Sequence, residues 1–345
     1  MASTISSSRR AIAAWLLACC ALVFVMVVVG GITRLTHSGL SIVEWQPILG
    51  AIPPLNEAQW QETFAKYQQT PEFRLRNHDM TLEGFKGIFW WEYVHRLLGR
   101  LIGLAFLLPF VYFLWRRMVP GELAWKLWAI FVLGGLQGAM GWYMVKSGLV
   151  DDPRVSSMRL AAHLGLAFLI YWAMLWVALG LLYPLRTPGS DAARRRAGLL
   201  VVLVFVMVLS GALVAAIRAG FAYNTWPLMN GQWIPDEIML LDPWWMNFIH
   251  NMATVQFVHR VLAVIIVLLA VIAWWRVRLE PPNPRARLWS HAMLVATAIQ
   301  VLLGITTLLM QVPVNLAALH QAGAVALFTC AIGLRHALRL APQLR

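Results

Sequence analysis

The sequence predicts an all-α integral membrane protein with eight transmembrane helices, arranged as two pseudo-symmetric four-helix bundles. Three observations predict this class: apolar segments of spanning length, a positive charge excess on one side, and an internal repeat. Of the 345 residues, 60% are hydrophobic and only 12% are charged, whereas soluble domains carry about 25% charged residues. A surface that faces only water cannot be built from this composition.

Each predicted helix is a mostly apolar segment of about 20 residues, which is the length that crosses a bilayer. The first segment is too long for the hydrophobic region of a signal peptide and has no evident cleavage site, so we expect it to remain as a span. The eighteen tryptophans suit the two membrane interfaces. In chain order the predicted spans are residues 12–32, 93–115, 124–145, 159–182, 197–217, 252–275, 287–310 and 315–337.

The net charge of +13 is distributed unevenly between the two sides of the predicted membrane protein. Arg9 and Arg10 precede the first span and indicate a cytoplasmic N-terminus. With that orientation, the inner segments carry the whole excess and the outer segments sum to zero, which is the positive-inside pattern. We therefore expect a multi-pass protein of the bacterial inner membrane with both termini cytoplasmic. The basicity reports topology and indicates no nucleic-acid partner.

An internal repeat divides the chain. The segments EYVHR at 92–96 and QFVHR at 256–260 open two of the predicted helices. Other matches follow in the same order, separated only by loop-sized gaps: Gln137 with Gln300, His163 with His320, and Gly31 with Gly211. The repeat predicts an N-terminal half at 1–183 with a long outer loop at 33–92, a cytoplasmic linker at 184–197, and a C-terminal half at 198–345.

Four histidines occupy equivalent positions in the two halves. An even number of helices per half keeps both halves in one orientation, so all four are expected at similar depth near the periplasmic face. An isolated histidine in a membrane helix is most simply a hydrogen-bonding residue between helices. Two symmetric pairs instead favour two heme sites, because porphyrin iron takes axial imidazoles from opposite sides. The predicted iron ligands are His95 with His163 and His259 with His320.

The two halves differ at one position beside these histidines. Glu92 lies three residues before His95, and Gln256 lies three residues before His259. A glutamate that is merely solvated or paired with an arginine would explain the difference without function. The functional interpretation is that one half carries out chemistry that needs a carboxylate, while the other only moves electrons.

Arginines gather near the predicted outer helix ends. Arginine binds carboxylates in a bidentate manner, so these side chains are candidates to contact heme propionates. Snorkelling of a long side chain to the interface is an equally open explanation for each one. The candidates are Arg34, Arg96 and Arg260.

The remaining cysteines and histidines point to no further site. Zinc is disfavoured, because each half offers two histidines and no thiolate or carboxylate that would complete a tetrahedron. The cysteines fall inside predicted spans, where packing explains them, namely Cys19, Cys20 and Cys330. The other histidines are expected in loops or near helix ends as non-ligands, namely His37, His78, His250, His291 and His336.

Three segments of the chain resemble the heme A synthase family: GGITRLTHSGLSIVEWQP at 30–47, PEFRLRNHDMTLEGFKGIFWWEYVHRLLGR at 71–100, and QFVHR at 256–260. The resemblance covers nearly the whole chain. It implies oxidation of a heme O methyl to a formyl group, through a hydroxylated intermediate, to give heme A for cytochrome c oxidase. It also implies a substrate heme between His95 and His163, heme B on His259 and His320, and Glu92 as catalytic carboxylate.

The chain departs from some bacterial members of that family, because its outer loops lack their cysteine pairs. It is more similar to the mitochondrial and α-proteobacterial branch with a long first loop. The resemblance implies heme O and heme A, membrane lipid, heme O synthase and oxidase assembly proteins as partners, and it leaves a homo-oligomer open. A diheme b-type electron carrier is the alternative from the residues alone, followed by a heme transporter or chaperone.

Overall fold

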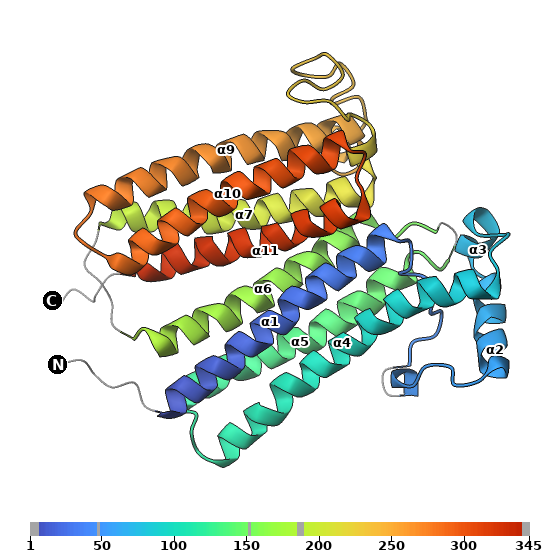
Figure 1. The fold of residues 1–345 in the computed structure, drawn as a ribbon, viewed down its shortest axis with the longest axis horizontal. Coiled ribbons are helices and arrows are strands. Elements are labelled where there is room, and N and C mark those ends of the chain that lie inside the picture. Colours follow the sequence, from blue (N-terminus) through green and yellow to red (C-terminus); the bar gives the residue numbers. More distant parts are fainter. Residues whose placement is uncertain (1–6, 47–48, 151–152, 185–189, 340–345) are drawn as a thin grey trace.

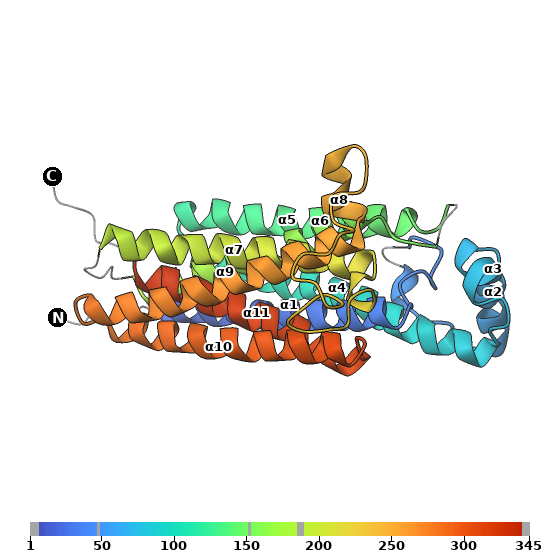
Figure 2. The ribbon, with the colours of Figure 1, turned by 90° about the horizontal axis from the view of Figure 1, so that it is seen from above.

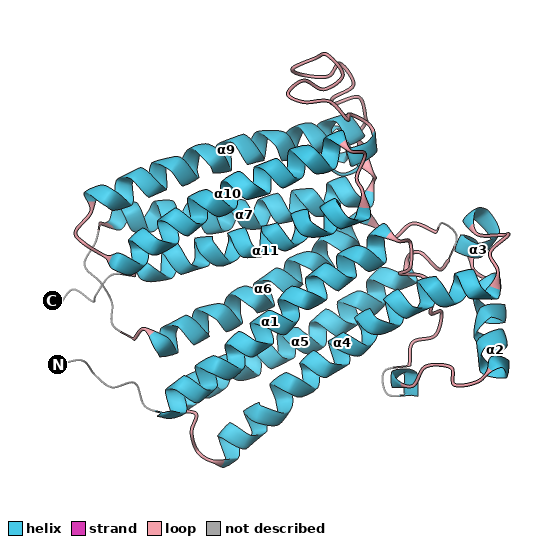
Figure 3. Cartoon of the chain, in the orientation of Figure 1, coloured by secondary structure: helices cyan, strands magenta, loops and turns pink. Residues whose placement is uncertain are grey.

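The computed structural model describes residues 7–46, 49–150, 153–184 and 190–339. Across these residues the regular structure is almost entirely helical (Figure 3), and eight helices are long and apolar enough to cross a membrane. The predicted all-α membrane class is therefore confirmed. The eight helices are α1 Ser7–Leu35, α4 Leu82–Trp115, α5 Gly121–Lys146, α6 Ser157–Leu182, α7 Asp191–Ala216, α9 Met252–Leu279, α10 Pro284–Leu309 and α11 Val314–Ala337.

Local sequence explains where several of these helices begin. The residue before the first turn supplies a side-chain oxygen that accepts an otherwise unpaired backbone N–H. This happens at Thr81 before α4, Ser190 before α7, Asn251 before α9 and Asn283 before α10. Pro284 follows its cap directly, where a proline costs no hydrogen bond. Each of these polar N-cap residues thus marks the point where a loop ends and a membrane-spanning helix begins.

The helices form two groups (Figure 1). The first bundle consists of α1, α4, α5 and α6, and the second consists of α7, α9, α10 and α11. In the first bundle α4 and α6 each pack against α1 and α5, so they face one another across the bundle. In the second, α9 and α11 each pack against α7 and α10. The bundles meet where α1 packs against α11 and α6 packs against α7.

A helical cap covers one end of the first bundle. It consists of α2 Glu57–Gln68 and α3 Pro71–Arg76, which Figure 2 shows beyond the start of α4. We call this the cap end of the molecule. Aromatic side chains of α2 pack against the first turns of α4 in a cluster that comprises Trp60, Phe64, Tyr67, Phe85, Phe89 and Tyr93.

The cap changes the expected boundary of the second span. The sequence placed its start at residue 93, whereas α4 begins at Leu82. Phe85 and Phe89 bury their rings against the cap, and this packing holds the helix beyond the spanning segment. The outer loop expected at 33–92 therefore contains α2, α3 and the first turns of α4. Within the linker expected at 184–197, α7 begins at Asp191, and residues 185–189 lie outside the described chain.

Candidate functional site

His95 and His163 lie on the facing helices α4 and α6 of the first bundle. Each imidazole packs against a glycine of a neighbouring helix. A Cβ at Gly30 on α1 would lie 2.8 Å from Cε1 of His95, and one at Gly141 on α5 would lie 3.1 Å from Cε1 of His163. Glycine therefore makes room for each ring. The two imidazoles are close enough to interact electrostatically.

His259 and His320 have the same surroundings in the second bundle. A Cβ at Gly211 on α7 would lie 3.3 Å from Cε1 of His259, and one at Gly304 on α10 would lie 2.9 Å from Cε1 of His320. These two imidazoles also interact electrostatically. The structure thus brings together both pairs of histidines that the sequence singled out.

The glycine contacts revise one match in the predicted repeat. The sequence paired Gly31 with Gly211, but Gly30 is the residue that contacts a histidine as Gly211 does. Gly31 instead faces Gln321 of α11, whose Nε2 donates a hydrogen bond of 2.9 Å to the carbonyl of Val27. Gly31 therefore serves the contact between the bundles.

Gln137 and Gln300 hold the second histidine of each pair. Nε2 of Gln137 donates to the carbonyl of His163 at 3.1 Å and lies 3.4 Å from its Nε2. Nε2 of Gln300 donates to the carbonyl of His320 at 2.9 Å and lies 3.2 Å from its Nδ1. The same amide orients the same histidine in each bundle.

The first histidine of each pair is held differently. Nδ1 of His259 lies 3.2 Å from the hydroxyl of Ser210. In the first bundle Val29 precedes Gly30 as Ser210 precedes Gly211, and Nδ1 of His95 has no hydrogen-bond partner among the described residues. A hydrogen bond to the outer nitrogen of a ligating imidazole fixes its orientation. The second bundle is the one that provides it.

Glu92 is 3% exposed, and protein donors bind both oxygens of its carboxylate. Oε2 accepts from the hydroxyl of Ser41 at 2.7 Å and from the backbone N–H of Ile42 at 2.8 Å. Oε1 accepts from Nε and one terminal nitrogen of Arg96, at 3.0 and 2.7 Å. The carboxylate is therefore paired with an arginine, as one interpretation of the sequence expected, and it is buried beside His95 on the same helix.

Gln256 occupies the corresponding place without a charge. Its Nε2 donates to the carbonyl of Ala219 at 2.8 Å, and its Oε1 accepts from Arg260 at 3.0 Å. The arginine partner is thus common to both bundles, and only the carboxylate is particular to the first. The predicted asymmetry is a difference in buried charge within the same local scaffold.

The three candidate arginines all bind backbone carbonyls. Terminal nitrogens of Arg96 donate to Ile42 and Glu44, and those of Arg260 donate to Tyr223, Pro227 and Leu228. Arg34 donates to the carbonyl of Ala215 at 2.9 Å at the end of α7. These contacts tie loops to helices and one bundle to the other. Nε of Arg260 has no acceptor among the described residues.

The histidine pairs fit a porphyrin iron better than a metal held by protein alone. The described residues contain no group of three or more His, Cys, Asp or Glu side chains that could hold a metal ion. Porphyrin iron needs only axial ligands from the protein. Nδ1 of His95 and Nδ1 of His163 are buried and lack partners in the described chain, so no protein hydrogen bond at these atoms commits the two imidazoles to a structural role.

Sequence reasoning missed two features at the cap end. Glu72 of α3 is 3% exposed, and no pattern in the sequence indicated its burial. His37 was expected only as a non-ligand, yet its Nε2 lies 2.6 Å from a terminal nitrogen of Arg218 in the second bundle. His37 and Arg218 are separated by the same number of residues as Gly30 and Gly211. A repeat aligned on Gly30 and Gly211 would therefore have placed His37 opposite Arg218.

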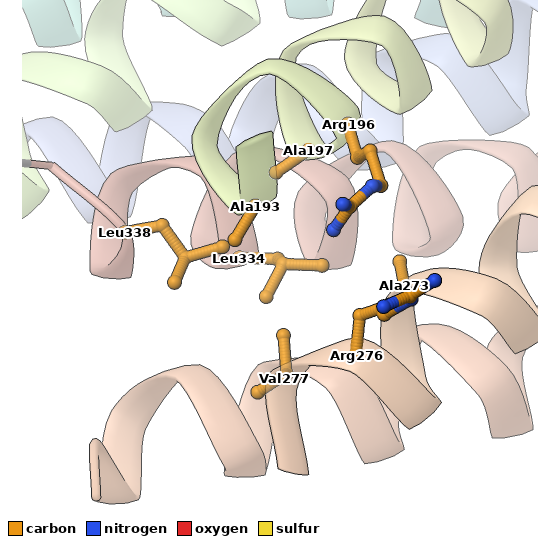
Figure 4. A pocket seen from close by; sticks show the side chains of 8 residues that line it. All are labelled: Ala193, Arg196, Ala197, Ala273, Arg276, Val277, Leu334 and Leu338. Atoms are coloured by element: carbon orange, nitrogen blue, oxygen red, sulfur yellow. The ribbon is translucent and has the colours of Figure 1, made fainter. Parts of the chain in front are cut away.

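A small pocket in the second bundle lies away from the two histidine pairs. Figure 4 shows it between α7, α9 and α11, and these ends of the helices lie opposite the cap end in Figure 1. Its lining is small and apolar apart from two arginines and consists of Ala193, Arg196, Ala197, Ala273, Arg276, Val277, Leu334 and Leu338. It contributes no residue to either histidine pair.

Comparison with known proteins gives one consistent result. Residues 13–332 match the family model described as cytochrome oxidase assembly protein. A protein named heme A synthase from Nitrosospira multiformis is 57% identical over 96% of this chain and 94% of its own length. Proteins of the same name from Nitrosomonas eutropha and Parvibaculum lavamentivorans are 55% and 50% identical, over 95% and 96% of this chain and 93% and 95% of their own lengths.

Proposed function

This chain belongs to the heme A synthase family of cytochrome oxidase assembly proteins, and on that premise we propose that it oxidises a methyl group of heme O to a formyl group. The product is heme A for cytochrome c oxidase, formed through a hydroxylated intermediate. The observation that carries the proposal is the buried Glu92 carboxylate, which lies beside one of the two histidine pairs and is replaced by the amide of Gln256 beside the other.

The two bundles take different hemes in this proposal. His95 and His163 hold the iron of the substrate heme O, and His259 and His320 hold heme B. The hydroxyl of Ser210 beside His259 supports a resident heme in the second bundle. Nδ1 of His95, which has no hydrogen-bond partner in the part of the chain that the structure describes, supports a first bundle whose occupant exchanges. When bound, heme B supplies electron transfer.

Glu92 acts as a fixed negative charge. Oxidation of the methyl group develops positive charge at the reacting carbon, and a preoriented, buried carboxylate stabilises that charge. The donors from Ser41, Ile42 and Arg96 hold the carboxylate in place. Gln256 provides no such charge beside the second histidine pair.

The propionates of the two hemes are proposed to lie toward Arg34, Arg96 and Arg260. Nε of Arg260, which has no acceptor among the described residues, supports this most directly, because the guanidinium of Arg96 already binds Glu92 and two carbonyls. We also propose that heme O synthase supplies the substrate and that oxidase assembly proteins take the product. The chain is a multi-pass membrane protein, and we place it in the bacterial inner membrane with both heme sites near the periplasmic face.

The test is the identity of the porphyrins that the purified full-length protein contains after expression with a source of heme O. Extraction and mass analysis are expected to give heme A or hydroxylated heme O together with heme B. Heme B alone, filling both sites, would instead identify a diheme electron carrier. The difference between Glu92 and Gln256 and the family membership do not favour that alternative.

A further inference from the structure

We propose that Glu72, in the cap formed by α2 and α3, is the proton-exchanging residue of the first-bundle site, carrying protons between the surroundings of Glu92 and the water at the cap end. This inference rests on the proposed function, because it assigns Glu72 to the reaction at the first histidine pair. It gives the cap a role beyond covering α4.

The contacts of Glu72 differ from those of a structural ion pair. Its side chain is 3% exposed, and among the described residues its carboxylate accepts one hydrogen bond, from the Tyr67 hydroxyl at 3.4 Å. That hydroxyl accepts a bond of 2.8 Å from Nδ2 of Asn77, which is partly exposed. Burying a carboxylate with so few partners is costly. A short polar path therefore joins a poorly solvated carboxylate to the surface of the cap.

The aromatic cluster connects Glu72 with Glu92. Tyr67, the hydrogen-bond partner of Glu72, packs in the same cluster as Ile42. The backbone N–H of Ile42 in turn binds Glu92. Both carboxylates thus bind residues of one cluster: Glu72 binds Tyr67, and Glu92 binds Ile42. The two carboxylates are also close enough for the negative charge of Glu92 to raise the pKa of Glu72.

Four charged or titratable groups face Glu72, from four helices. Burial is the main cause that raises the pKa of Glu72 to about 7, and the negative charge of Glu92 on α4 acts in the same direction. Arg76 on α3, the Tyr67 hydrogen bond from α2, and Arg34 on α1 oppose it. A carboxyl group in this balance gains and loses a proton near neutral pH, which an ordinary glutamate does not.

Glu92 is less suited to proton exchange. Its carboxylate accepts four hydrogen bonds, two of them from Arg96, whereas that of Glu72 accepts one among the described residues. Glu72 therefore takes the proton-exchanging role, and Glu92, whose two oxygens are both bound by protein donors, keeps the electrostatic role proposed above.

The proposed step is proton transfer alone. An O–H bond forms on the carboxylate of Glu72 when it takes up a proton, and the same bond breaks when the proton passes to water at the cap surface. The reverse order delivers a proton to the site. No electron moves at Glu72, so the step needs no oxidant or reductant of its own.

The first test observes the carboxyl group itself and needs no turnover. Infrared difference spectra of the full-length protein are recorded as pH is raised through about 7. The wild-type protein is expected to lose a carboxylic-acid C=O band over this range, and Glu72→Gln is expected to lack that change. Glu62→Gln is the matched control, because Glu62 is an exposed residue of the same cap. A band that titrates unchanged in Glu72→Gln overturns the assignment.

The second test is the pH profile of heme A formation. Wild-type activity is expected to show an inflection near pH 7 that Glu72→Gln lacks. Turnover by Glu72→Gln is expected to be slower than that of the wild type by at least about 10-fold, and Glu72→Asp is expected to recover part of this activity. The second-bundle heme spectrum should be unchanged in each variant. If the wild-type protein makes heme A with the same pH profile as Glu72→Gln, the proposed role of Glu72 is wrong but the proposed function stands. A wild-type protein that makes no heme A at any pH removes the proposed function and this role with it.

Discussion

At the scale of single residues, the two bundles differ most clearly in one functional group. The side chains of Glu92 and Gln256 have the same length, and each residue lies three positions before the first histidine of its bundle. Each side chain binds an arginine one helical turn later, Arg96 and Arg260 respectively. The second bundle therefore shows that an amide is compatible with this scaffold. The carboxylate in the first bundle is retained although its burial costs desolvation free energy, which indicates a use for the charge.

Replacing Glu92 by glutamine should separate charge from shape. We expect heme A formation to fall by about 100-fold or more, because a preoriented charge at the reacting carbon is lost. The loss should be measured by porphyrin extraction, while the absorption spectrum of the second-bundle heme stays unchanged. Glu83→Gln, at an exposed position near the start of α4, is the control. Undiminished turnover in Glu92→Gln would remove Glu92 from the reaction.

His37 gives a second prediction at this scale, for stability rather than activity. Burial, together with the positive charges of Arg218, Arg34 and Arg76, lowers the pKa of His37 to about 4. The unfolded chain binds a proton near the ordinary value of 6.5, so the folded state binds fewer protons between these two values. The contribution of His37 to stability is therefore full above about 6.5 and is lost as pH falls toward about 4.

This prediction can be tested by thermal unfolding of the detergent-solubilised protein at several pH values. His37→Asn is the variant of choice, because His37 has a φ of 55° and asparagine tolerates the left-handed region. As pH falls, the unfolding midpoint of the wild type is expected to decrease more than that of His37→Asn. A difference that does not change with pH would contradict the shifted pKa.

At the scale of helices, each histidine depends on a glycine of its neighbour. Four helix pairs repeat this contact: α1 with α4, α5 with α6, α7 with α9, and α10 with α11. An imidazole that fills the space of a missing Cβ has little freedom to turn, so the helix packing determines where its nitrogens lie. The glycines at these contacts therefore position the four histidines.

Gly304→Ala should accordingly weaken heme binding in the second bundle. The added Cβ would lie 2.9 Å from Cε1 of His320, and overpacking of this kind costs about 1–3 kcal/mol. We expect a reduced content of second-bundle heme in the purified protein, measured from its absorption spectrum. Gly103→Ala is the control, because nothing lies within 4 Å of a Cβ at that position. Equal heme content in both variants would show that the contact does not position His320.

At the scale of the whole molecule, the bundles are joined in the membrane and at the cap end. Tyr171 of α6 and Thr329 of α11 share a hydrogen bond of 2.8 Å, and Gln321 of α11 bonds to α1. At the cap end Arg34 binds the end of α7, and Arg218 binds His37. Both histidine pairs are therefore held in one framework, in which the first bundle alone carries the helical cap.

The proposed orientation can be tested by cysteine labelling, since the native cysteines are free thiols within α1 and α11. Gln61→Cys lies on the exposed face of the cap, and Arg195→Cys lies near the start of α7 at the other end. A membrane-impermeant maleimide applied to intact cells is expected to label Gln61→Cys, and to label Arg195→Cys only after permeabilisation. The opposite pattern would invert the proposed topology.

The sequence by itself determined the membrane class, the eight spans and the histidine pairs, because hydropathy, charge asymmetry and repeated motifs are local or periodic properties of the chain. It could not show that α4 continues to Leu82, since that extension depends on aromatic packing against α2. It also missed Glu72 and the bridge from His37 to Arg218. Burial of a carboxylate and contacts between distant loops arise only when the chain has folded, and tertiary structure alone decided which polar groups lose water and which partners they find.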